Sequence, residues 1–147
     1  MTANRPAHPV PCATTVSRLS SHRGRMVTLL MKTIDAEHPW YRELSAQDRS
    51  WVGLVAGASV DAFIRWCRDK HSAPSSPQEI FSAAPAELTR TVSLHRTLQL
   101  VKSGVEVIEQ EAEVISAPGK AHELREAIWR YSREFAFATA EVYARAA

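Results

Sequence analysis

The residues of this chain that could do chemistry are histidines and carboxylates on predicted helices. His122 and Glu126 stand four positions apart, so both side chains lie on one helix face, where they could share a metal ion or form a solvated ion pair. We favour the ion pair, and the chain contains no His-Glu-x-x-His zinc motif. Glu109, Glu111 and Glu113 alternate along a helix, so their side chains point in different directions. They predict an acidic solvated surface rather than a divalent metal site.

No enzyme motif is present in the sequence. The chain has neither a glycine-rich phosphate loop nor a nucleophile elbow. His95 lies beside the longest apolar stripe, and an inward histidine in a globin-like bundle could bind haem. We favour a hydrogen-bonded structural histidine, because His95 has no recognisable partner ligand in the sequence. We therefore predict no catalytic residue, no metal site and no cofactor, and a protein that is not an enzyme.

Charge argues against nucleic-acid binding by the body of the chain. The formal net charge of the 147 residues is only +2. Residues 1–34 carry five basic side chains and no acid, whereas residues 35–147 carry 13 bases against 16 acids. The larger part is therefore slightly acidic and repels phosphate. The basic start could still touch an acidic partner.

The sequence favours a cytoplasmic protein that does not enter a membrane. No apolar run approaches the roughly 18 residues of a membrane span. The apolar run at residues 26–31 follows two arginines, as in a signal peptide, but it is short and Lys32 interrupts it. Cys12 and Cys67 are isolated and match no metal or redox spacing. Two free thiols are typical of a reducing compartment.

Two long apolar seams predict the architecture. The first helix of the pair should cover residues 94–115, where apolar residues alternate at spacings of four and three: Leu94, Leu98, Val101, Val105, Ile108, Ala112 and Ile115. The second repeats the pattern at Leu124, Ile128, Tyr131, Phe135, Ala138 and Val142. Pro118 and Gly119 end the first helix. The loop between the two helices is so short that the second helix must run antiparallel to the first. We predict an all-α helical bundle built on this long antiparallel helical hairpin, with a globin-like arrangement as one form of it.

The remaining segments are predicted to wrap the hairpin. Residues 1–15 read as a disordered lead-in, and residues 16–147 as a single helical domain. A helix over about 16–36 should be followed by a connector at 40–44, and a second helix should start after Ser45, which can cap it together with Asp48. Gly53 and Gly57 on adjacent turns allow either a close helix crossing, which we favour, or room beside a ligand. Capping and proline signals predict short helices within residues 77–92.

The last helix is apolar on more than one face. Outside its main seam it carries Trp129, Ala136, Phe137, Ala140, Tyr143 and Ala144. Such a helix must bury both faces, against another helix of the domain, a second copy of the chain or an apolar ligand. We favour the second copy and take Trp129, Phe137, Ala140 and Tyr143 as the candidate dimer interface. Arg130 and Arg133 border this region and could receive an anionic head group, or they are simply solvated.

Several stretches together resemble a known family. They are residues 40–44 (WYREL), 48–55 (DRSWVGLV), 84–90 (APAELTR), 131–138 (YSREFAFA) and 140–147 (AEVYARAA). These resemble the N-terminal domain of actinobacterial PucR/CdaR-type transcriptional regulators, including those that control fatty-acid and mycolic-acid synthesis. The likeness covers nearly everything after residue 25. It extends distantly to the N-terminal modules of RsbR-type stress regulators, which are helical and globin-like without haem.

The resemblance implies the N-terminal part of a longer cytoplasmic regulator whose DNA-binding helix-turn-helix lies in a C-terminal region beyond Ala147. Residues 16–147 would then be a regulatory domain that takes in a signal and dimerises. An apolar or acyl-type effector would enter between helices near Phe63, Trp66, Leu98, Tyr131 and Phe135. The alternative is a purely structural dimerisation or partner-docking module with no small ligand. Cys67 and the pair at 70–71 depart from the family pattern, so the effector can differ from that of relatives.

Overall fold

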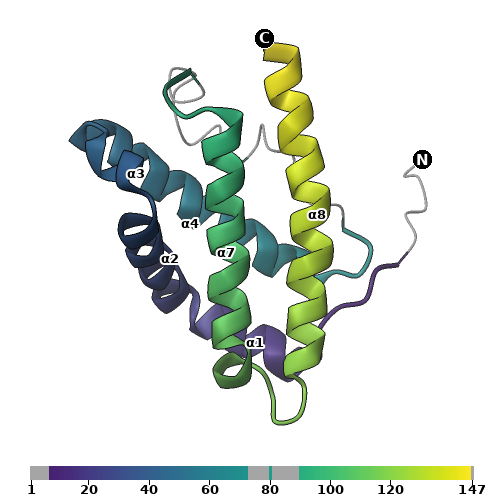
Figure 1. The fold of residues 1–147 in the computed structure, drawn as a ribbon. Coiled ribbons are helices and arrows are strands. Elements are labelled where there is room, and N and C mark those ends of the chain that lie inside the picture. The colour runs from purple at the N-terminus through teal and green to yellow at the C-terminus, as the bar shows by residue number, and fades with distance from the viewer. Residues whose placement is uncertain (1–6, 73–79, 81–89, 147) are drawn as a thin grey trace.

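The fold is a bundle of helices, seen in a computed structural model that describes residues 7–72, 80 and 90–146. The helices, labelled as in Figure 1, are α1 (Ala13–Ser21), α2 (Arg23–Glu37), α3 (Pro39–Glu43), α4 (Ala46–Arg68), α7 (Leu94–Ile115) and α8 (Ala121–Ala146). No strand occurs within the described ranges. The prediction of an all-α fold is confirmed.

The predicted hairpin is the central feature. Helices α7 and α8 lie side by side and antiparallel along most of their length (Figure 1). Both ends of α7 agree with the predicted range of residues 94–115. The Ser93 hydroxyl caps the first turn by accepting from the Arg96 N–H at 3.2 Å, and the helix ends at Ile115. In the turn between the helices, Gly119 has a φ of 75°, a left-handed conformation that favours glycine.

Helix α4 forms the second layer of the bundle. It crosses behind the hairpin and packs against α1, α2 and α8 (Figure 1). Its start agrees with the predicted cap, since the Ser45 hydroxyl accepts from the Asp48 N–H at 3.0 Å. Its buried face includes Val52, Ala62, Phe63 and Trp66, whereas Val55 is only partly buried.

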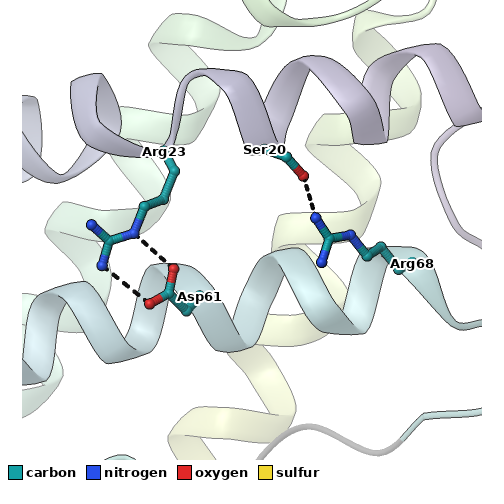
Figure 2. A network of polar contacts seen from close by, with 4 residues as sticks. All are labelled: Ser20, Arg23, Asp61 and Arg68. Carbon is teal, nitrogen blue, oxygen red and sulfur yellow. Dashed lines mark hydrogen bonds and ion pairs between the residues drawn. The ribbon is translucent and has the colours of Figure 1, made fainter.

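The helix predicted over residues 16–36 is two helices, with a break at His22. The backbone there leaves the helical region, with φ −97° and ψ 10°, and the His22 ring Nδ1 lies 2.7 Å from the carbonyl oxygen of Arg18. Both halves are tied to α4 (Figure 2). Arg23 forms a two-pronged ion pair with Asp61 at 2.8 and 3.1 Å, and Arg68 donates to the Ser20 hydroxyl at 2.6 Å.

The predicted lead-in needs correction where the structure describes it. Helix α1 begins at Ala13, so the expected boundary at residue 15 falls inside a helix. The preceding residues also pack: the His8 N–H donates to the Lys70 carbonyl at 2.8 Å, and the His8 ring stacks on Trp66 at 3.8 Å between centroids. The Trp66 ring of α4 and a backbone acceptor just after that helix thus hold in place a segment whose composition suggested disorder.

The other predicted segments have mixed outcomes. The connector at 40–44 contains a short helix, α3, which buries Tyr41. The short helices predicted within 77–92 lie mostly outside the described residues, although Ile80 is buried in the core. Within the described ranges, no helix combines the length and the apolarity that a membrane span requires.

Candidate ligand cavity

A cavity of about 130 Å³ lies between four helices of the bundle. Helix α2 lines it with Met26, Leu30 and Ile34. Helices α4, α7 and α8 and the segment before α7 supply the rest of the wall. Their lining residues include Ser59, Phe63, Val92, Thr97, Val101, Gly104, Ile108, Tyr131, Ser132, Phe135 and Tyr143. Each helix turns its buried stripe inward, so the same apolar periodicity that builds the core also builds the wall.

The wall is apolar, and its few polar groups are hydroxyls. No Asp, Glu, Lys, Arg or His side chain lines the cavity among the described residues. Ser59 and Ser132 each donate to a carbonyl oxygen of their own helix, at 2.8 and 3.2 Å. Because these hydroxyls are already bonded within their helices, they leave the space suited to an apolar occupant.

Tyr143 closes one part of the wall with a short hydrogen-bond chain. Its hydroxyl donates to the Val92 carbonyl at 2.9 Å and lies 2.9 Å from the Thr97 hydroxyl, which therefore donates to it. Partial burial raises the pKa of Tyr143, and the Thr97 hydrogen bond opposes that shift. The last turns of α8 are thereby fastened to the beginning of α7.

Tyr131 is the most buried phenol at the cavity. It is 5% exposed, and its ring packs near Phe63 and Phe135 at centroid distances of 5.3 and 5.9 Å. Its hydroxyl oxygen has no hydrogen-bond partner among the described residues. Burial raises the pKa of Tyr131 because the phenolate would lose its hydration.

Gly104 leaves open space in the α7 wall. It lies three residues after Val101 and four before Ile108, on the stripe that lines the cavity. A Cβ atom placed on Gly104 would meet nothing within 4 Å. By contrast, a Cβ on Gly57 would lie 3.2 Å from Arg23 Nη2, and a Cβ on Gly53 would lie 4.0 Å from Met31 Cε. Both neighbours are the ends of side chains, so the close helix crossing favoured for these two glycines stays a prediction.

Three of the five predicted ligand residues line the cavity, namely Phe63, Tyr131 and Phe135. Trp66 and Leu98 are not among the described lining residues. Trp66 is instead buried under the His8 ring. The contributions of α2 and of Gly104 to the cavity were not predicted, although a glycine inside a regular apolar seam is a signal for open space at Gly104.

The predicted dimer residues divide into two groups. Trp129 and Phe137 are 59% and 71% exposed, although both are large and apolar. Ala140 is partly buried, and Tyr143 is engaged with α7 through the hydrogen bonds given above. The exposed apolar face of α8 therefore centres on Trp129 and Phe137 rather than on Tyr143.

The candidate metal and haem residues do not form the contacts that would make a site. The predicted ion pair between His122 and Glu126 is wrong, because Glu126 accepts two hydrogen bonds from Arg130, at 3.0 and 3.1 Å, and His122 is exposed. His95 is exposed and lies 3.4 Å from the Gln99 amide. Among the described residues, no group of three or more His, Cys, Asp and Glu side chains is placed to hold a metal ion.

No known family model matches the chain. It is 32% identical over 152 aligned positions to uncharacterized proteins of Mycobacterium bovis and of two strains of Mycobacterium tuberculosis. The alignment covers 97% of this chain but only 36% of each mycobacterial protein. Almost the whole chain is thus similar to about a third of these longer relatives.

Proposed function

We propose that this domain is the signal-input and dimerisation module of a cytoplasmic transcription regulator, and that an apolar small molecule is its signal. The cavity between α2, α4, α7 and α8 is the observation that carries the proposal. Pockets between the helices of a bundle, with apolar walls and few polar groups, are common sites for small ligands. DNA binding would reside in a C-terminal region, as the resemblance to PucR/CdaR-type regulators implies.

The cavity offers a route from ligand to output. Most of its wall comes from four helices, so a ligand that fills it would favour one set of distances between these helices over another. A ligand shifts such an equilibrium only by its difference in affinity for the two arrangements. The hydrogen bonds of Tyr143 to Val92 and Thr97 join the cavity wall to the end of α8, which leads toward the C-terminus. The output region would sense the position of that end.

The exposed face of α8 supports the dimerisation part of the proposal. Trp129 and Phe137 lie eight residues apart, which places them about 80° apart around the helix axis, within one broad face of α8. Large exposed aromatic residues on one face are typical of protein interfaces. A second copy of the chain would cover them by an isologous contact, in which the same patch is used by both partners.

Native mass spectrometry of the purified chain tests both parts together. We expect a mass of two chains, together with a small apolar molecule that co-purifies or that binds when added. A clean dimer that no apolar compound binds or stabilises against heat would instead favour a purely structural dimerisation or docking module. A monomer that binds ligand would remove dimerisation from the proposal and leave sensing in place.

A further inference from the structure

We infer that the cavity selects a compact, uncharged apolar molecule and that Gly104 creates the space for it. This inference rests on the proposed function and narrows its ligand class. Three observations carry it: the charge of the wall, the size of the cavity and the open space at Gly104.

The wall excludes ionised groups. An ionised carboxylate or phosphate that leaves water needs a cation or several donors in compensation. No lysine, arginine or histidine side chain lines the cavity in the described part of the chain. The hydroxyls of Ser59 and Ser132 already donate within their own helices, and the Tyr131 hydroxyl, which has no partner among the described residues, supplies one donor where an ionised group needs several. The charged head of an acyl compound would therefore have to stay outside, and only its uncharged part could enter.

The volume limits the occupant to a small molecule. The cavity measures about 130 Å³. Engineered apolar cavities of about 150 Å³ stay dry and bind a single benzene ring. A ligand of about that size fits wholly inside, whereas a long acyl chain would extend beyond the wall.

Gly104 determines the shape of this space. Thr97, Val101, Gly104 and Ile108 follow one another at helical spacing along the lining face of α7. A side chain at position 104 would project from that face into space where the first 4 Å beyond its Cβ are empty. Leucine at 104 should occupy the volume that the ligand would otherwise fill.

The test compares toluene with benzoate, which share a ring and differ in charge, by calorimetric titration of the purified chain and of two variants. Gly104→Leu fills the cavity. Gly24→Leu is the matched control, because a Cβ on Gly24 also meets nothing within 4 Å but Gly24 does not line the cavity. We expect toluene to bind the natural chain and Gly24→Leu alike, benzoate to bind at least tenfold more weakly, and Gly104→Leu to lose toluene binding.

Other outcomes overturn the inference in distinguishable ways. If benzoate binds as tightly as toluene, the cavity does not exclude ionised ligands, but the proposal that the domain senses a ligand still stands. Toluene binding that survives in a folded Gly104→Leu variant would refute the role of Gly104. If that variant does not fold, Gly104→Ala serves instead, and an unchanged toluene affinity there would refute the same point. A charged lipid found by native mass spectrometry, with no toluene binding, would refute the inference but not the proposed function, whereas absence of any ligand would refute both.

Discussion

The guanidinium of Arg18 donates from Nε to the carbonyl oxygen of Ile115 at 2.7 Å, and from Nη2 to that of Val114 at 2.7 Å. An arginine of α1 thus covers the C-terminal end of α7, where carbonyl groups lack partners within their own helix and the helix dipole is negative. The turn that follows is held as well, because the Ala117 N–H donates to the Thr15 hydroxyl at 3.0 Å. Helix α1 therefore stabilises the bend of the hairpin.

Replacing Arg18 should weaken this end of the hairpin. Arg18→Met keeps the aliphatic length and removes both hydrogen bonds, and we expect a loss of about 1 kcal/mol in the free energy of unfolding. Arg25→Met is the control, because the ion pair of Arg25 with Glu111 at 3.4 Å starts from an exposed side chain, and its loss should cost about 0.5 kcal/mol or less. Urea denaturation measures both. Equal losses would contradict the capping role of Arg18.

Alanine at two helical glycines should have different effects on stability. Gly104→Ala should stabilise the chain by up to about 1 kcal/mol, because alanine is the better helix former and the new methyl has room. Gly57→Ala should gain clearly less, since its Cβ would crowd Arg23 Nη2 at 3.2 Å and disturb the ion pair with Asp61. Thermal unfolding compares them. A larger gain from Gly57→Ala would show that Arg23 is not held in place.

The two thiols should differ strongly in reactivity. Hydrogen bonds from the Thr15 side chain and backbone lower the pKa of Cys12, which is partly exposed. Burial raises the pKa of Cys67 and also denies access to reagents. Labelling with a disulfide reagent at neutral pH should therefore modify Cys12 alone until urea unfolds the chain. Two rapidly reacting thiols in the folded chain would show that the core around Cys67 opens readily.

Stability should fall in alkaline solution. Burial raises the pKa of Tyr131 and of Cys67 in the folded chain above their ordinary values of 10.0 and 9.0. The folded state then holds protons that the unfolded state has released, so the free energy of unfolding decreases as pH rises above about 9. Tyr131→Phe should make this decrease shallower, which urea titrations between pH 8 and 11 would detect. An unchanged slope would mean that the Tyr131 hydroxyl meets water in the folded chain.

Introducing a charged side chain on the exposed face of α8 should dissociate the proposed dimer of the chain. Trp129→Glu and Phe137→Glu place carboxylates where two apolar patches would meet, and we expect both variants to sediment as monomers. Leu54→Glu is the matched control, because Leu54 is also a large apolar residue, 50% exposed, but on α4. A dimer that survives in both α8 variants, or that Leu54→Glu dissociates, would move the interface away from α8. Tyr143 is unsuitable for this test because its hydroxyl bonds to Val92 within the fold.

The sequence predicted most of the hairpin and only part of the cavity. A 3.5-residue period of apolar residues runs from Leu94 to Ile115 and allows one helix face to be buried. Both ends of α7 could therefore be predicted to the exact residue. The break at His22 escaped prediction because it depends on local hydrogen bonding and on ties to α4 that periodicity does not record. Tyr143 looked like an interface residue, since its partner Thr97 lies 46 positions earlier in the chain.

The size and exact position of the cavity could not be predicted, because they depend on how four helices pack together and no single stretch of sequence specifies that packing. Phe63, Tyr131 and Phe135 were identified as large apolar residues near its position, and they do line it. Gly104 lines the cavity without a side chain, and its place inside the apolar seam was a signal that went unused. The globin-like form of the bundle stays a prediction.

The partners of α1 also bear on how the chain assembles during synthesis. Arg18, Thr15 and the Cys12 N–H find their partners at Ile115, Ala117 and Glu123, between 97 and 111 residues later. These contacts can form only after α7, the turn that follows it and the start of α8 have been synthesised. A nascent chain that stalls before residue 115 therefore lacks all three of these contacts, although its α1 can already reach α4 through the hydrogen bond from Arg68 to Ser20.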